Sequence, residues 1–466
     1  MIGVLARALL SQLLLAGFGL GVLQLLSRRR VGLSLLPWAW GVGVVALYVV
    51  GQVYVRGELL PGRWHPIVAG LMAGGFAAGI LRWLRLAPPE PAAAPAPRWR
   101  WFDVALAGLI VIKIGMVAYV STHDPVFDAD ATLANGYAPL AKQIGEGVSA
   151  RDALAPAHGV AISPWGPPIL LAWVRLFLDR WHDSVAGLPW LIAFVSIIGM
   201  AIVTARDITR NRTVALACGY AFSAIPLLAT HAIRIGYNDL LTAYFVTMGL
   251  SVATRAFLAT TGPGAPWIAV AAAAVAGSAL SKLEGRMWAA WLLLMGLGLA
   301  LHRLRGMRWR TILMLQAAGL ALAFVAYQVL AARLLASSAG DRLSFLVPHG
   351  YEPGAAATTL SFLFGWGSFS IWGWLCALLT GSLLAWRVPA ASRALALYSA
   401  GMVLGVVYVA NFTGSVQFTA EGSNLGRFLL QVTGVLLPLG CAYAAEAVTP
   451  VAAPPAPGPQ RRAARR

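Results

Sequence analysis

Three aspartates stand close together in one polar stretch of the chain. They are Asp124, Asp128 and Asp130 in THDPVFDADATLANGYAPLAKQIGEG, which follows an apolar run. A carboxylate in this position could act as a general base or as a metal ligand. The alternative is a solvated acidic loop in which one aspartate caps the helix expected at about 131–144. The D-x-D spacing also suits a shared divalent cation, magnesium or manganese, although the sequence requires no cofactor.

Two further turns carry charges of both signs. HAIRIGYNDLLTAYF places Arg234 and Asp239 just before an apolar run, and SALSKLEGRMW places Lys282 and Glu284 between two apolar runs. Ionisable residues in a membrane are costly, which makes them candidates for function. The alternatives are a helix cap for Asp239 and snorkelling at the membrane interface for Lys282.

A single arginine, Arg427, opens the last apolar run, after the polar segment NFTGSVQFTAEGSNLG. A guanidinium near carboxylates suits phosphate binding, because its planar fork donates two parallel hydrogen bonds. A topological anchor is the alternative interpretation.

The composition defines the environment in which these residues must be positioned. Of 466 residues, 59% are hydrophobic and 11% are charged, against about 25% charged in ordinary soluble domains. A soluble chain this apolar could not cover its surface, so the sequence predicts an all-α integral membrane protein. The net charge of +18 lies in short clusters between apolar runs, which favours positive-inside topology over nucleic-acid binding. The three cysteines lie inside apolar runs and predict neither disulfides nor a metal site.

Thirteen apolar runs are of membrane length. They lie at about 4–26, 36–55, 66–86, 101–121, 187–205, 213–230, 240–257, 266–282, 286–301, 311–335, 370–386, 394–410 and 428–447. A Pro/Ala-rich linker at 87–100 separates the first three runs from the others. We therefore expect a three-helix N-terminal unit at 1–86, a membrane core at 101–447 and a basic tail at 448–466.

The run at 165–181, PWGPPILLAWVRLFLDR, decides the orientation. If it does not span, the arginine clusters at 27–30, 82–100, 206–212 and 302–310 all face one side, which the positive-inside rule makes the cytoplasm. We therefore predict an interfacial, amphipathic helix on the external side. The N-terminus is then outside, the C-terminus is cytoplasmic, and most of the 17 acidic residues lie outside.

The order of these motifs resembles that of the GT-C type membrane glycosyltransferases, which include protein O-mannosyltransferases, oligosaccharyltransferases and aminoarabinose transferases. In that family an acidic loop and a surface helix follow the first core span, and FDADATLANGYAPLAKQIGEG is similar. The proline-rich external helix of the family is similar to SPWGPPILLAWVRLF, which lacks the usual histidine. A small-Tyr-x-Asp turn matches GYND at 236–239, and a Thr/Ser-Lys-x-Glu-Gly turn matches SKLEG at 281–285.

The resemblance covers roughly 101–447 and implies roles for individual residues. Asp130, in preference to Asp128, would be the catalytic carboxylate, and Asp239 would be the acid of the second loop. Asp128 and Asp130 would hold the divalent cation if one is used. The residues that bind the donor and its phosphate would be Arg234, Tyr237, Lys282, Glu284, Arg427 and Lys142. The three added N-terminal spans depart from the family, and the absence of a large C-terminal soluble domain argues against an oligosaccharyltransferase proper.

The implied function is transfer of a sugar from a polyprenyl-phosphate donor to a lipid, glycan or protein acceptor, on the periplasmic face of a bacterial inner membrane. The chemistry is consistent, since a phosphate leaving group needs cations and an acceptor hydroxyl needs a carboxylate base. The expected partners are the lipid-linked sugar and membrane lipid, without nucleic acid. The alternatives are a transporter or lipid-linked sugar flippase, and a polysaccharide polymerase or ligase. A transporter should show interrupted helices at matching positions of two halves, which the sequence does not reveal.

Overall fold

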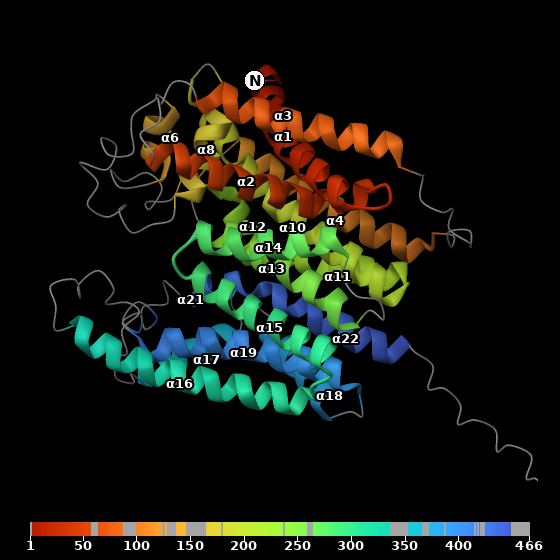
Figure 1. The fold of residues 1–466 in the computed structure, drawn as a ribbon, viewed down its shortest axis with the longest axis vertical. Coiled ribbons are helices and arrows are strands. Elements are labelled where there is room, and N and C mark those ends of the chain that lie inside the picture. The colour runs from red at the N-terminus through yellow and green to blue at the C-terminus, as the bar shows by residue number, and fades with distance from the viewer. Residues whose placement is uncertain are drawn as a thin grey trace, which may run out of the picture.

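The computed structural model forms a bundle of helices that lie side by side (Figure 1). The row runs from α3 (Trp64–Arg85) at one edge, through α13 (Asn238–Leu258), to α16 (Trp309–Leu335) at the other. The structure describes residues 2–56, 64–86, 99–123, 126–127, 137–145, 165–178, 180–235, 238–258, 264–335, 353–365, 372–385, 388–413, 416, 419 and 425–448.

The described elements are helical apart from two short strands. The remaining elements are α1 (Ile2–Leu26), η1 (Leu33–Leu35), α2 (Leu36–Arg56), α4 (Trp101–His123), β1 (Val126–Phe127), α6 (Tyr137–Gly145), α8 (Gly166–Leu176), α9 (Asp183–Ala186), α10 (Leu188–Thr209), α11 (Arg212–Ser223), α12 (Pro226–Ile233), β2 (Arg234–Ile235), α14 (Ala265–Ser281), α15 (Gly285–Arg305), α17 (Pro353–Phe364), α18 (Trp372–Ala385), α19 (Ala390–Phe412), α21 (Leu425–Gln431), η6 (Thr433–Val435) and α22 (Leu436–Val448).

Local sequence signals set several helix ends. Prolines stand in the first turns of α8, α10, α12 and α14, where the missing N–H costs no hydrogen bond. The side chain of Asn211 caps α11 by accepting from the backbone N–H of Val214 at 3.3 Å. Helix α15 ends at Gly306, whose φ of 63° lies in the left-handed region that glycine adopts without strain.

The predicted all-α membrane fold is confirmed at this coarse scale. In the described part of the chain, eight helices are long and apolar enough to cross a membrane. The count rises to ten if the bent pairs α11–α12 and α21–α22 each form one span, with bends of 59° and 43°. Four shorter apolar helices lie within α14, α16, α17 and α18. Those in α14, α16 and α18 correspond to the three remaining runs of membrane length, whereas α17, at 353–364, was not predicted by any run.

The segment at 165–181 forms a helix, and other helices of the bundle pack against it. Helix α8 has 11 residues and is therefore about 16 Å long, too short to span a bilayer. Every residue from Gly166 to Val174 is buried, since α8 packs between α6 and α2. The prediction of a helix that does not span agrees with this length. Helices α6 and α2 cover α8, and its interfacial position stays a prediction.

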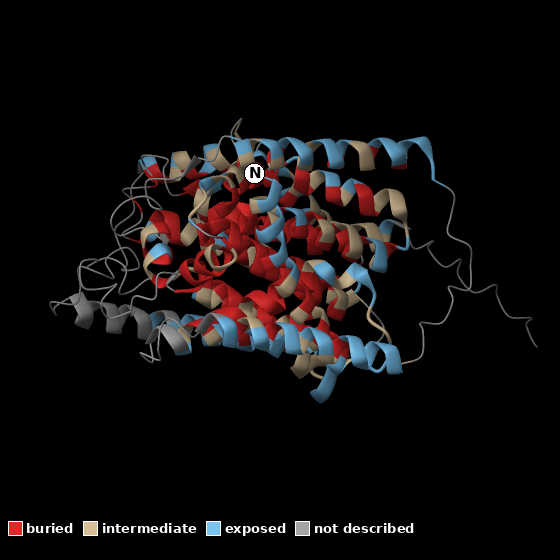
Figure 2. Ribbon diagram, turned by 90° about the horizontal axis from the view of Figure 1, so that it is seen from above, coloured by how far each residue is buried: buried red, intermediate tan, exposed pale blue. Residues whose placement is uncertain are grey.

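Helix α13 lies at the centre of the bundle (Figure 1), and nearly all of its residues are buried. The buried residues of the chain gather in the interior of the molecule (Figure 2). The N-terminal helices are joined to α13 through α2. The indole nitrogen of Trp38 donates to Ser251 at 2.7 Å, and Tyr244 donates to the carbonyl oxygen of Pro37 at 2.5 Å. The guanidinium of Arg255 lies between the rings of Trp38 and Trp267, 4.7 and 4.5 Å from their centroids. The predicted N-terminal unit and core are therefore packed together.

The two ends of α13 differ in charge. At its C-terminal end Arg255 pairs with Asp207 at 2.9 Å, and Arg212 from the same turn region lies over the ring of Trp99 at 4.5 Å. We call this the arginine-rich end. Asp239 lies near the opposite end, about 24 Å from Arg255 along the helix axis, because 16 residues at about 1.5 Å each separate them. The full length of α13, 21 residues or about 31 Å, matches the thickness of a bilayer's hydrocarbon core.

Candidate functional site

The carboxylate of Asp239 is the centre of a buried polar cluster in the first turn of α13. Its side chain is fully buried, and three side chains donate to it. The ammonium of Lys282 and the amide of Gln431 each lie 2.6 Å from Oδ1, and Nε of Arg427 lies 3.0 Å from Oδ2. We call Asp239, Lys282, Arg427 and Gln431 the Asp239 cluster. A buried carboxylate requires such partners, because desolvation without them is prohibitive.

The turn between α14 and α15 delivers Lys282 to this cluster. Helix α14 ends at Ser281, and Lys282 is extended, with φ −156° and ψ 158°. Helix α15 then begins at Gly285, where a Cβ atom would overlap the carbonyl oxygen of Ser278. Glycine is therefore required for the chain to fold back this tightly, which explains the position of glycine in the SKLEG motif.

Helix α21 delivers the other two donors. Arg427 and Gln431 are four residues apart, so they lie on one face of α21. The side-chain oxygen of Gln431 accepts from the indole nitrogen of Trp288, in α15, at 2.7 Å. This bond fixes the amide so that its NH₂ group points at Asp239. The sequence analysis missed Gln431 and Trp288, although a glutamine four residues after Arg427 in an apolar helix is a readable signal.

The cations of the cluster are more accessible than the acid that holds them. The side chain of Arg427 is 25% exposed and that of Lys282 is 14% exposed, whereas that of Asp239 is 0% exposed. Glu284 lies 3.5 Å from Lys282. Burial disfavours the charge on Lys282, but the carboxylates of Asp239 and Glu284 outweigh burial and raise the pKa of Lys282 above its usual value. Lys282 therefore stays charged at neutral pH and offers a fixed positive charge to an anion.

A two-stranded parallel pairing brings a distant segment to this site. In the pairing of β1 with β2, Val126 lies opposite Arg234 and Phe127 lies opposite Ile235. Strand β2 precedes the turn to Asp239 by only a few residues, and β1 ends one residue before Asp128 in the sequence. The pairing thus places Val126 and Phe127 beside the strand that precedes Asp239 in the chain.

Among the residues that the structure describes, the side chain of Asn238 has no hydrogen-bond partner. Asn238 is 2% exposed, and neither its side-chain nitrogen nor its oxygen makes a hydrogen bond in the structure. A buried amide without partners carries the full cost of desolvation. Native proteins tolerate such a group where water, an ion or a ligand completes its bonding. Asn238 is directly next to Asp239 in the chain, and water or a ligand is needed to complete the bonding of its amide.

The structure brings together only part of the predicted set. Asp239, Lys282, Glu284 and Arg427 meet, as described above. Arg234 is exposed in β2, and the ammonium of exposed Lys142 lies 5.2 Å from the ring centroid of Trp181. Tyr237, Asp128 and Asp130 lie outside the described residues.

The predicted divalent-cation site of Asp128 and Asp130 lies outside the residues that the structure describes. Among the residues that the structure describes, no three His, Cys, Asp or Glu side chains gather closely enough to hold a metal ion. The predicted ligands Asp128 and Asp130 are outside those residues, so their role stays a prediction. Comparisons with protein-family models, curated proteins and solved structures find no match to the chain.

Proposed function

We propose that the chain is an integral membrane glycosyltransferase that moves a sugar from a polyprenyl-phosphate donor to an acceptor on the external face. One observation supports this function best: two cations from distant helices are held side by side on one buried carboxylate, at the end of the bundle opposite the arginine-rich end. A lipid-linked phosphate requires this position, because its headgroup lies at a membrane surface while its tail stays in lipid.

In this proposal Lys282 and Arg427 bind the donor phosphate. When the glycosidic bond breaks, the leaving phosphate gains negative charge, and fixed cations in a low-dielectric site stabilise that charge. The cations are held in place before the donor arrives, so little reorganisation is needed. Their exposed fractions, 14% and 25%, leave part of each side chain available for contact.

Asp239 then positions the cations and does not act as a base. Its two oxygens already accept from three donors, and its side chain is fully buried beneath them, so an acceptor hydroxyl does not reach it. We assign the base to Asp130, with Asp128 as the alternative and with a shared divalent cation as an option. The pairing of β1 with β2 supports this division, because it places Phe127, the residue before Asp128, beside the strand that precedes Asp239.

The proposal includes a finer topology than the eight to ten candidate spans. We infer thirteen spans, with the arginine-rich end in the cytoplasm, the Asp239 cluster on the periplasmic side of a bacterial inner membrane, and the N-terminus outside. The GT-C assignment of 101–447 is part of this proposal.

A transfer assay with purified full-length protein tests the function. Lys282→Gln and Arg427→Gln should each lower the apparent affinity for a polyprenyl-phosphate sugar by at least about tenfold, since truncating a buried charged contact costs about 2–5 kcal/mol. Arg286→Gln is the matched control, because Arg286 is exposed near the same turn and its substitution removes the same charge. Donor use that is equal in all three variants would contradict the proposal.

A flippase is the second candidate, and the bent helices favour it. The pairs α11–α12 and α21–α22 are each interrupted. The C-terminal end of α12 leads to β2, and α21 carries Arg427 of the Asp239 cluster. Interrupted helices around a buried charged site are typical of transporters. Proteoliposomes that contain labelled lipid-linked sugar but no acceptor distinguish the two, because a flippase equilibrates the label between leaflets and a transferase does not. A polymerase or ligase would differ in its acceptor, a growing glycan.

A further inference from the structure

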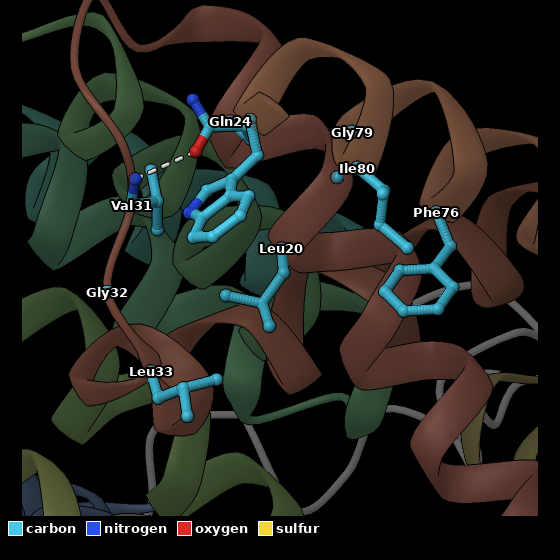
Figure 3. Close-up of a pocket in the computed structure, with 10 residues that line it drawn as sticks. Leu20, Gln24, Val31, Gly32, Leu33, Phe76, Gly79 and Ile80 are labelled. Atoms are coloured by element: carbon cyan, nitrogen blue, oxygen red, sulfur yellow. Dashed lines mark hydrogen bonds between the residues drawn. The ribbon is translucent and has the colours of Figure 1, made fainter. Parts of the chain in front are cut away.

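A groove separate from the Asp239 cluster lies at the arginine-rich end, between α1 and α3 (Figure 3). Its volume is about 120 Å³, and its walls are mainly apolar. Leu20 of α1 lies in the middle, with Leu33 and Val31 on one side and Ile80 and Phe76 of α3 on the other. The side-chain oxygen of Gln24 accepts from the backbone N–H of Val31 at 2.7 Å, so the wall made by the turn after α1 is held in place.

The groove opens to lipid. Helix α3 lies at the edge of the bundle, and its side chains near the groove are exposed, including Ile80 at 43% and Leu84 at 59%. Its floor is closed by direct helix contact, because a Cβ on Gly79 would overlap the backbone of Gly21. The space is therefore a lipid-facing crevice between two helices that touch.

The chain segments that flank the groove are rich in arginine. Five arginines flank it in the sequence, at 28, 29, 30, 82 and 85, and the sole acidic residue of positions 1–86 is Glu58, which follows the opposite end of α2. The side chain of Arg30 is held against the C-terminal end of α3. It donates to the carbonyl oxygen of Leu86 at 2.8 Å and lies 4.3 Å from the ring centroid of Trp83. The side chains of Arg28, Arg82 and Arg85 are exposed.

We propose that this groove binds an anionic phospholipid from the leaflet on the arginine-rich side. The lipid phosphate would contact Arg82, Arg85 and Arg28, and the upper part of one acyl chain would lie over Leu20 and Ile80. Basic pockets between membrane helices are suited to anionic headgroups. A second copy of the chain is a poorer occupant, because it would bring the same five arginines against these and the like charges would repel. The inference does not depend on the proposed transferase activity.

Native mass spectrometry of the full-length protein in detergent tests the proposal, with phosphatidylglycerol and phosphatidylcholine of identical acyl chains as probes. We expect preferential retention of phosphatidylglycerol, with a loss of about fivefold per arginine in the double variant Arg82→Gln, Arg85→Gln. The control is Arg308→Gln with Arg310→Gln, an exposed arginine pair from another turn, which should leave retention unchanged. Ile80→Trp, which fills the groove, should weaken retention of both lipids.

Three outcomes would overturn the proposal. The first is equal retention of the two lipids by the unmodified protein. The second is an equal loss in the control double variant, which would indicate general attraction by surface charge. The third is displacement of phosphatidylglycerol by an equimolar polyprenyl phosphate, which would assign the groove to a lipid-linked donor. A thermal unfolding midpoint measured for each variant confirms that the folded protein is being compared.

Discussion

At the scale of single residues, the site depends on how one carboxylate is shared. The carboxylate of Asp239 accepts hydrogen bonds from Lys282, Arg427 and Gln431. The amide of Gln431 is in turn fixed by a hydrogen bond from the indole of Trp288. An acid in this arrangement fixes the direction of two cations. A ligand would contact the partly exposed Lys282 and Arg427, and not the buried Asp239.

The charge on Lys282 predicts how the stability of the site depends on pH. The folded pKa of Lys282 is raised above the ordinary value of 10.5, so its pairing stabilises the fold in full below about pH 10.5 and is lost as pH rises through the folded pKa. The difference in unfolding free energy between the unmodified protein and Lys282→Met should therefore be constant from about pH 7 to pH 9. It should shrink above pH 10.5. Denaturant unfolding in detergent at several pH values measures it, and a difference that falls between pH 7 and pH 9 would contradict this assignment.

Asn238 offers a test that separates folding from binding. Because its amide makes no hydrogen bond in the protein, replacing it with leucine of similar size removes an uncompensated polar group. Asn238→Leu should leave the unfolding free energy unchanged or raise it by about 1 kcal/mol. Donor affinity should fall about tenfold if the amide binds the ligand. Thermal unfolding and donor binding on the same preparation measure both, and a destabilised variant would show that the amide has a structural partner.

The residues that form the Asp239 cluster could be predicted only in part from the sequence. Asp239, Lys282 and Arg427 were found because charges at the ends of apolar runs are costly and therefore conspicuous. Gln431 and Trp288 are ordinary residues within apolar helices, and their importance follows from a contact across 143 positions. A pattern of local spacing carries no information about such a contact.

At the scale of elements, the turn between α14 and α15 depends on the missing side chain of Gly285. Gly285→Ala would place a Cβ against the carbonyl oxygen of Ser278 and move Lys282 away from Asp239. We expect a loss of about 1–3 kcal/mol of stability together with weaker donor binding. Gly296→Ala is the matched control, because Gly296 lies in the same helix with open space around its Cα. It should be neutral or stabilising, since alanine favours helix. Equal effects of the two substitutions would show that the turn is not tightly constrained.

The positions of most helices followed from the apolar runs, because the length and polarity of a run determine whether it can form a membrane helix. The breaks did not. The run at 213–230 bends by 59° between α11 and α12, just before Pro226, and the run at 428–447 bends by 43° after Gln431. A proline signals the first break, but tertiary packing decides whether the helix kinks or continues. The pairing of β1 with β2 joins residues 108 positions apart through two-residue strands, too short for any sequence pattern.

At the scale of the whole molecule, charged side chains lie near both ends of α13, a helix about as long as a bilayer's hydrocarbon core is thick, and this predicts the labelling of introduced cysteines. In a variant that lacks the three native cysteines, Asp152→Cys and Glu352→Cys should react with an impermeant thiol reagent added from outside. Asn211→Cys and Glu90→Cys should react only after permeabilisation. External labelling of position 90 would reverse the orientation. Reporters fused after Asp183 and after Asp124 should report the same side, since α8 is too short to span.

If this membrane protein carries out sugar transfer, Asp130→Asn is the variant that should stop it. Asparagine keeps the shape and hydrogen-bonding capacity of aspartate but does not accept a proton at neutral pH. Asp128→Asn and Asp124→Asn are the controls, with a chelator added to separate a metal-free base from a metal ligand. We expect Asp130→Asn to abolish transfer from a polyprenyl-phosphate sugar while donor binding and membrane yield stay near normal. Full transfer activity in all three variants would contradict this expectation.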